Sequence, residues 1–232
     1  MHHRTASTIV LGITAVLALA ACSPGAPENR PADGAPSRTH SSADNGRGDA
    51  VLSSPELASR LLGESDLGAG YTRKPERPSG NNDDVTVLGC PALDDLGSEA
   101  ATGSGGGLDF PRRAKAAFAH SSGAEVTKEL YSDTARKLSD GTGRIFDAMT
   151  GCPAYRVLAD STLVDITTHE VPAPQLGDEQ WSHLLAFSTG GRETVVKQTA
   201  IRDGSQLLIV SGSPELVDRH LATALDKATA TG

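Results

Sequence analysis

Two histidines and a glutamate have residue types and a spacing that could hold a metal ion. His169 and Glu170 end one alternating, strand-like segment, and His183 lies in the next one. Zinc takes imidazole nitrogens and carboxylate oxygens as ligands, so neighbouring strands could bring these residues together. The period of a strand, however, places His169 and Glu170 on opposite faces. We therefore expect these histidines to be packed or solvent-facing, and we expect neither a metal site nor a cofactor.

A second group of candidate residues lies just before and within the strand-like segment 180–188. Asp178, Glu179 and Trp181 bring two carboxylates next to the only tryptophan of the chain. Loops held on a rigid sheet often carry binding residues, and an indole offers an apolar face with a polar edge. We name these three residues as candidate ligand contacts. The alternative is a plain turn in which Trp181 is anchored in the core.

Known catalytic signatures are missing from the sequence. It contains no G-x-S-x-G, S-x-x-K, H-E-x-x-H or C-x-x-C pattern and no EF-hand loop. Residues 102–107 are rich in glycine but lack the Lys-Ser/Thr ending of a phosphate-binding loop, which favours a surface loop. We expect no catalytic residues and no enzymatic activity. A hydrolase of unfamiliar type is the alternative.

The N-terminus has the organisation of a secretory signal peptide. Arg4 precedes an apolar core and small residues, and the stretch 8–21 is shorter than the roughly 20 residues that a spanning helix needs. The Leu-Ala-Ala-Cys sequence that ends at Cys22 resembles the bacterial lipobox, in which the cysteine receives a diacylglycerol and the chain is cut before it. We expect residues 1–21 to be removed and Cys22 to carry the lipid. An ordinary signal peptide is the alternative.

Charge excludes two classes of partner. The chain has 21 Lys and Arg against 29 Asp and Glu, a net charge of −8, and removal of Arg4 with a signal peptide would make it more negative. Phosphate backbones and anionic headgroups repel an acidic protein. We therefore expect no nucleic-acid partner, and we expect contact with the plasma membrane, at its extracytoplasmic face, through lipid on Cys22.

The segment after that cysteine differs in composition from the rest of the chain. Residues 22–50 contain no Leu, Ile, Val, Met or aromatic side chain. Without apolar surface to bury, a segment cannot offset the entropy of ordering. We expect a disordered tether there and one folded domain in residues 51–232.

Two cysteines are left in this domain. A secretory signal implies an oxidising compartment, where disulfides persist. The even number of remaining cysteines, Cys90 and Cys152, therefore favours a disulfide between them. A bridge would close a loop of about 62 residues and stabilise the fold by roughly 4 kcal/mol in the chain-entropy model. Two separate buried thiols are the alternative.

Helix signals mark both ends of the domain. Ser-Pro-Glu at residues 54–56 predicts the start of a short helix, and the same tripeptide at 213–215 predicts a C-terminal helix with a long apolar face. A third helix is predicted from Ser132 to Gly151, where apolar residues recur at helical spacing.

Between the helices the apolar residues recur at every second position, which is typical of strands. The predicted strands are residues 84–88, 113–120, 125–131, 162–171, 180–188, 193–202 and 205–211. Strands joined by tight turns, such as Asp203-Gly204, must be antiparallel. We therefore predict an α+β fold: a twisted antiparallel sheet with the helices packed on one of its faces.

A set of short motifs spans nearly all of residues 51–230: Leu61-Leu62, Asp66-Leu67, Gly70-Tyr71, Cys90-Pro91 with Leu93, Ala117-Phe118, Phe146 to Cys152, and Leu176 to Glu179. Together these motifs resemble the extracellular, sensor-like domain of the actinobacterial kinase PknH and its stand-alone lipoprotein relatives. The resemblance implies a twisted antiparallel sheet with helices against it, a cleft regarded as a possible ligand site, and no demonstrated catalysis.

These features predict a membrane-anchored extracytoplasmic lipoprotein whose sensor-like domain binds a small ligand or an envelope protein. A carrier of apolar cell-envelope lipids is the alternative function, and it predicts a large apolar cavity inside the domain.

Overall fold

The computed structural model describes residues 50–75, 85–97, 100, 110–159 and 161–230. The predicted signal peptide, Cys22, the tether up to residue 49 and the glycine-rich segment 102–107 lie outside the described residues. None of the described helices combines the length and the hydropathy that a membrane crossing requires.

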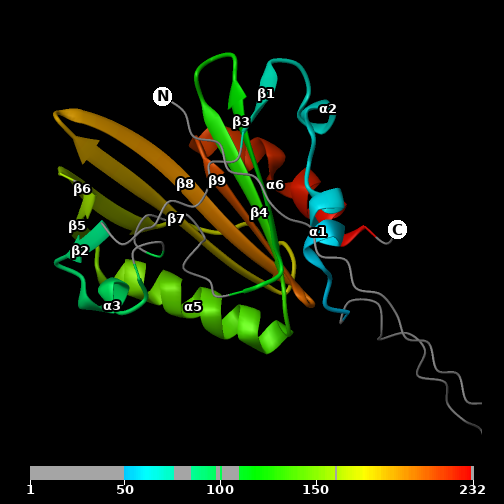
Figure 1. The fold of residues 1–232 in the computed structure, drawn as a ribbon, viewed down its shortest axis with the longest axis horizontal. Coiled ribbons are helices and arrows are strands. Elements are labelled where there is room, and N and C mark those ends of the chain that lie inside the picture. The colour runs from blue at the N-terminus through cyan, green and yellow to red at the C-terminus, as the bar shows by residue number, and fades with distance from the viewer. Residues whose placement is uncertain (1–49, 76–84, 98–99, 101–109, 160, 231–232) are drawn as a thin grey trace, which may run out of the picture. The chain divides into compact units, whose positions relative to one another are not determined.

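A nine-stranded antiparallel sheet forms the centre of the described structure (Figure 1). In their order across the sheet, the strands are β1 (Tyr71–Lys74), β3 (Arg113–His120), β4 (Glu125–Ser132), β9 (Gln206–Gly212), β8 (Arg192–Asp203), β7 (Glu179–Thr189), β6 (Thr162–Glu170), β5 (Ala154–Ala159) and β2 (Val85–Leu88). Every neighbouring pair is antiparallel. The predicted α+β class and the antiparallel sheet are confirmed.

Helices cover both faces of the sheet, so the prediction of one covered face is wrong. The helices are α1 (Ser54–Arg60), α2 (Glu64–Leu67), α3 (Pro91–Asp94), α5 (Ala135–Gly151) and α6 (Pro214–Thr229). Helix α5 packs on one face, and α1 and α6 pack on the other (Figure 1). The cause is visible in β9, where Leu207 and Ile209 join the core under α5 while Leu208 and Val210 join the core under α6. A central strand is apolar on both sides, whereas strict alternation assumes one wet face.

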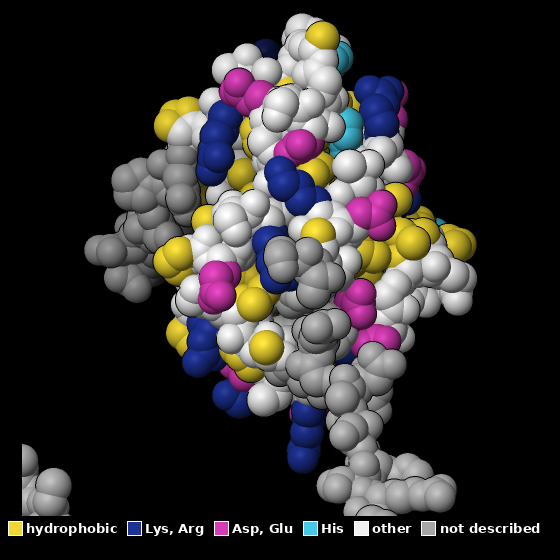
Figure 2. All heavy atoms as spheres, turned by 90° about the vertical axis from the view of Figure 1, so that its right-hand side faces the viewer, with side chains coloured by type: hydrophobic (Ala, Val, Ile, Leu, Met, Phe, Trp, Pro, Cys, Tyr) yellow, Lys and Arg dark blue, Asp and Glu magenta, His cyan; other side chains and the backbone are white. Residues whose placement is uncertain are grey.

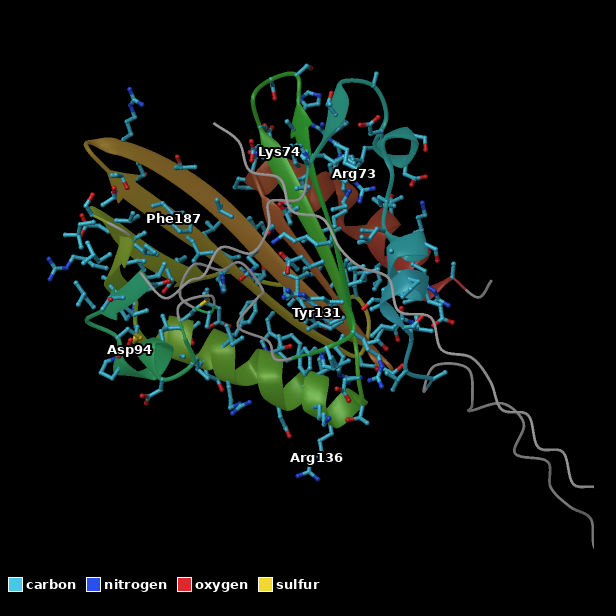
Figure 3. All side chains as sticks on the ribbon, in the orientation of Figure 1. Arg73, Lys74, Asp94, Tyr131, Arg136 and Phe187 are labelled. Atoms are coloured by element: carbon cyan, nitrogen blue, oxygen red, sulfur yellow. A yellow bond between two sulfur atoms is a disulfide. The ribbon has the colours of Figure 1, made fainter. Side chains whose placement is uncertain are left out.

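Helix α5 lies along the sheet with its apolar side inward. Leu138, Phe146 and Met149 are buried on this side of the helix. Tyr131, from the end of β4, is buried in the same core, whereas Arg136 points away from the sheet (Figure 3). The predicted helical period of this segment is therefore confirmed.

The predicted starts of the first and last helices are confirmed to within one residue, whereas α5 has its N-cap at Thr134, two residues after the predicted start at Ser132. Ser53, and not Ser54, is the N-cap of α1, and its backbone N–H and its hydroxyl both donate to the Glu56 carboxylate, at 2.7 and 2.6 Å. Ser213 is the N-cap of α6, and Pro214 fills the first helical position.

Two strands were not predicted. In β5, Tyr155 and Val157 are buried two positions apart, so the alternating signal is present but short. In the edge strand β1 only Tyr71 is buried, and its polar neighbours leave no periodic signal. Edge strands contribute few buried side chains, and hydrophobic periodicity therefore detects them poorly.

The disulfide between Cys90 and Cys152 is confirmed, with its Cα atoms 5.8 Å apart. Cys90 is the N-cap of α3 directly after β2, and Cys152 is the C-cap of α5. The bridge thus ties the short edge strand β2 to the C-terminal end of the helix that bounds the cleft described below.

Candidate functional site

Asp178 and Glu179 lie in an ion-pair network with Arg202 of β8. The Arg202 Nη1 is 2.9 Å from Asp178 Oδ2, and its Nε is 2.9 Å from Glu179 Oε2. The Gly204 N–H donates to Asp178 and, together with Arg202, lowers the pKa of this carboxyl. The hydrogen bond from Arg202 lowers the pKa of Glu179. Both carboxylates therefore hold the β6–β7 connection against the β8–β9 turn, and their role as ligand contacts stays a prediction.

Gly177 explains why this connection fits so closely. Its φ of +65° lies in the left-handed region, and a Cβ atom there would lie 2.6 Å from the Arg202 carbonyl oxygen. The next residue, Asp178, donates its N–H to that same oxygen at 2.8 Å. Only glycine permits this approach of two backbones.

Trp181 lines a cleft of about 530 Å³ between α5 and the connection from β6 to β7. The side chains that shape it include Phe146, Asp147 and Thr150 from α5, Glu170 and Gln175 from the end of β6 and the connection, and Gln180 and Trp181 from β7. Clefts of this volume are in the range that binds small molecules. The structure thus brings Trp181 to a recess, whereas Asp178 and Glu179 do not line it.

The floor of the cleft is aromatic. The rings of Phe146 and Trp181 are 6.1 Å apart between centroids, and Trp181 is partly buried against the core under α5. The Phe146 ring lies in turn 4.4 Å from the ring of His183, which is fully buried. Trp181 is therefore both anchored in the core and available at the cleft, so the two sequence interpretations describe one side chain.

His183 is the buried titratable group beneath this floor. It lies opposite Gln198 in the β7–β8 register. Burial lowers the pKa of His183 to about 4, so the imidazole is neutral at physiological pH.

Of the two histidines and the glutamate that the sequence analysis considered as metal ligands, only His183 and Glu170 share a face of the sheet. They lie opposite each other in the β6–β7 register, whereas His169 lies opposite Leu184 on the other face. Within the described ranges, no three His, Cys, Asp or Glu side chains are grouped so that they could hold a metal ion.

Two carboxylates are the charged groups in the lining of the cleft. Asp147 and Glu170 line it, and no Lys, Arg or His belongs to its lining. A second cleft, of about 920 Å³, lies along α5, shares Asp147 with the first, and is lined by both signs of charge, including Lys137 and Arg144. Of these two clefts, the one at Trp181 has a lining with a single sign of charge.

Sequence reasoning missed a buried lysine on the opposite side of the sheet. Lys128 of β4 is fully buried, its Nζ lies 5.2 Å from the centre of the Phe118 ring, and burial lowers its pKa to about 7. Nearby, the hydroxyl of Tyr71 and Nε2 of His220 are 2.6 Å apart. The alternation of the strand could have shown that Lys128 is buried, because it occupies the inward position between Val126 and Leu130.

Comparison with known proteins supports the fold. No protein-family model matches the chain, and no curated protein matches its sequence. The crystal structure of the extracellular domain of PknH from Mycobacterium tuberculosis matches with a TM-score of 0.56 and 13% identity, covering 77% of this chain and 97% of that domain. An uncharacterized protein from Mycobacterium smegmatis matches with a TM-score of 0.42 and 14% identity, over 75% of this chain and 97% of that one.

The chain therefore has an α+β fold of a known class. More narrowly, this fold is similar to that of the extracellular domain of PknH, and the resemblance predicted from the short motifs is confirmed at the level of the fold.

Proposed function

We propose that the protein is a lipoprotein anchored at the extracytoplasmic face of the plasma membrane, with a sensor-like domain that binds a small ligand and catalyses no reaction. A signal from this domain would pass through a partner protein of the envelope. The observation that carries the binding part is the cleft beside Trp181, which joins an aromatic floor to two carboxylates on elements fixed by the fold.

Three observations support an extracytoplasmic position. The Cys90–Cys152 disulfide is of a kind that persists in oxidising compartments. The sequence before Cys22 has the organisation of a lipoprotein signal. The fold is similar to that of a domain described as extracellular.

The anchor is tested by replacing Cys22 with Ala in the full-length protein. We expect the wild-type protein to enter the detergent phase after phase separation and the variant to stay in the aqueous phase or to remain unprocessed. Globomycin, which blocks lipoprotein signal cleavage, should give a larger form of the wild-type protein only. Unchanged size and partitioning in both experiments would show that the anchoring part of the proposal is wrong.

Binding is tested by fluorescence, because Trp181 is the only tryptophan of the chain and lines the cleft. We expect compounds that enter the cleft to change its emission in a saturable way. A broad set of small cations, anions and neutral molecules should therefore contain at least one class that does so. The proposal fails if calorimetry detects binding while the emission of Trp181 stays constant, because the ligand would then bind elsewhere.

The alternative of a lipid carrier is not favoured by this cleft. A carrier of apolar lipids needs a large apolar cavity, whereas this recess has carboxylate and amide side chains around an aromatic floor. Native mass spectrometry of the protein purified from its membrane separates the two functions, since a carrier retains a lipid besides its own anchor.

A further inference from the structure

We infer that the cleft beside Trp181 selects a small organic cation, an amine or quaternary ammonium group attached to an apolar group. This inference rests on the proposed binding function and adds the chemical class of the ligand. It is carried by three properties of the cleft: the sign of its charges, the accessible indole and the rigidity of its walls.

The first property is the sign of its charges. Asp147 and Glu170 are the charged residues of the lining, and neither carboxylate forms an ion pair with any residue that the structure describes. Elsewhere acids and bases are mixed, as on the side of the molecule shown in Figure 2. Two unpaired anions in a recess concentrate a negative potential there. The cleft therefore attracts cations and repels carboxylates and phosphates.

The second property is the aromatic floor. Of its two rings, Phe146 is only 5% exposed, so Trp181 is the more accessible one. Among aromatic side chains, tryptophan attracts cations most strongly through its ring face. Its indole also offers apolar surface to whatever carries the charge. An ion with an apolar group satisfies both the carboxylates and the indole, whereas a hydrated metal ion satisfies only the carboxylates.

The third property is rigidity, because a preformed site loses less entropy when it binds. The Thr168 hydroxyl contacts the carbonyl oxygens of Met149 and Cys152, at 2.7 and 3.2 Å, and thereby fixes the end of α5 to β6. The Val171 N–H donates to the Ser182 carbonyl at 3.0 Å and holds the start of the β6–β7 connection to β7. Both walls of the cleft are therefore tied to the sheet by hydrogen bonds next to the ligand position.

The test uses three probes that share a phenyl ring and differ in charge: benzyltrimethylammonium, benzyl alcohol and benzoate. Each is titrated into the full-length protein while the emission of Trp181 is followed. We expect the cation to bind about tenfold or more tightly than the neutral and anionic probes. We also expect its affinity to fall as salt is added, because salt screens exposed charges.

A charge-neutralised variant tests the two carboxylates. Both side chains are exposed, so Asp147→Asn combined with Glu170→Gln should leave the melting temperature nearly unchanged and weaken binding of the cation about tenfold. The matched control, Glu193→Gln combined with Asp226→Asn, removes the same two charges from exposed positions away from the cleft. We expect wild-type affinity in the control.

Two outcomes would overturn the inference. One is tighter or equal binding of benzyl alcohol or benzoate, and the other is wild-type affinity for the cation in the doubly neutralised variant. In the first case saturable quenching by the other probe still supports a binding cleft, so the proposed function survives while the ligand class fails. The proposed function itself is tested separately, by the broad set of compounds described above.

Discussion

Acid should destabilise this protein through His183, well before its carboxyl groups are protonated. The pKa of this buried imidazole is about 4 in the folded chain and about 6.5 in an unfolded one. Between these values the unfolded state binds more protons than the folded state, so stability is complete above pH 6.5 and is lost as the pH falls toward 4. From the two pKa values, the loss between pH 7 and pH 5 is about 2 kcal/mol.

A second histidine contributes in the same direction. Burial also lowers the pKa of His220 to about 4. The wild-type protein should therefore lose more unfolding free energy between pH 7 and pH 5 than the about 2 kcal/mol that His183 accounts for. Such a loss is a large part of the stability of a typical domain.

The assay is urea denaturation at a series of pH values, followed by far-ultraviolet circular dichroism. In His183→Gln, the fall between pH 7 and pH 5 should be smaller than in the wild-type protein by about 2 kcal/mol, whatever the stability of the variant at neutral pH. The matched control is His169→Gln, since His169 is exposed and lies on the opposite face of the sheet. A wild-type slope in His183→Gln would refute the assignment of the acid sensitivity to this residue.

Three further predictions concern stability. Replacing both Cys90 and Cys152 by Ala should lower the unfolding free energy by about 4 kcal/mol, as measured by urea denaturation, and a loss below about 1 kcal/mol would contradict the loop-entropy argument. Gly177→Ala should lower the unfolding free energy by about 2 kcal/mol or more, because its Cβ would meet backbone at 2.6 Å. Gly190→Ala, also at positive φ but with no atom within 4 Å, should lower it by about 1 kcal/mol. Equal melting temperatures of the two variants would contradict this difference. Lys128→Met should stabilise the fold by about 1–3 kcal/mol at pH 7, because it removes a buried amine without a hydrogen-bond partner among the described residues. The lowered pKa of Lys128 also makes the wild-type protein more stable as the pH rises from 7 to about 10.4, and the variant should lack this rise. A rise that persists in the variant would disprove the assignment to Lys128.

The sequence predicted the elements with strong periodicity and missed what depends on neighbours in the sheet. Helix α5 and the hairpin of β3 and β4 follow from local patterns of apolar residues, and both are confirmed. The covered second face does not, because a run such as Leu207 to Val210 reads as a strand in either environment. Only the strand order, which puts β9 inside the sheet between β4 and β8, decides that both sides are buried.

The candidate site shows the same division. Trp181 could be named as a candidate from the sequence, but the grouping of Asp147 with Glu170 could not, since they come from different elements and meet at the cleft only in the fold. Asp178 and Glu179 stand closer to Trp181 in sequence, yet Arg202 pairs with both of them. A carboxylate near a tryptophan in sequence therefore says little until its ion-pair partners are known.

The cleft and the acid-sensitive core beneath it share one ring. Phe146 contacts Trp181 on the cleft side, and its ring lies 4.4 Å from the ring of His183 on the buried side. A bound organic cation and a proton on His183 are both positive charges held near this ring, so each disfavours the other. Because such coupling is reciprocal, acid weakens cation binding by the same factor by which the bound cation reduces the proton affinity of His183. We therefore expect the affinity for such a cation to fall as the pH approaches 4, where His183 of the folded protein takes up a proton.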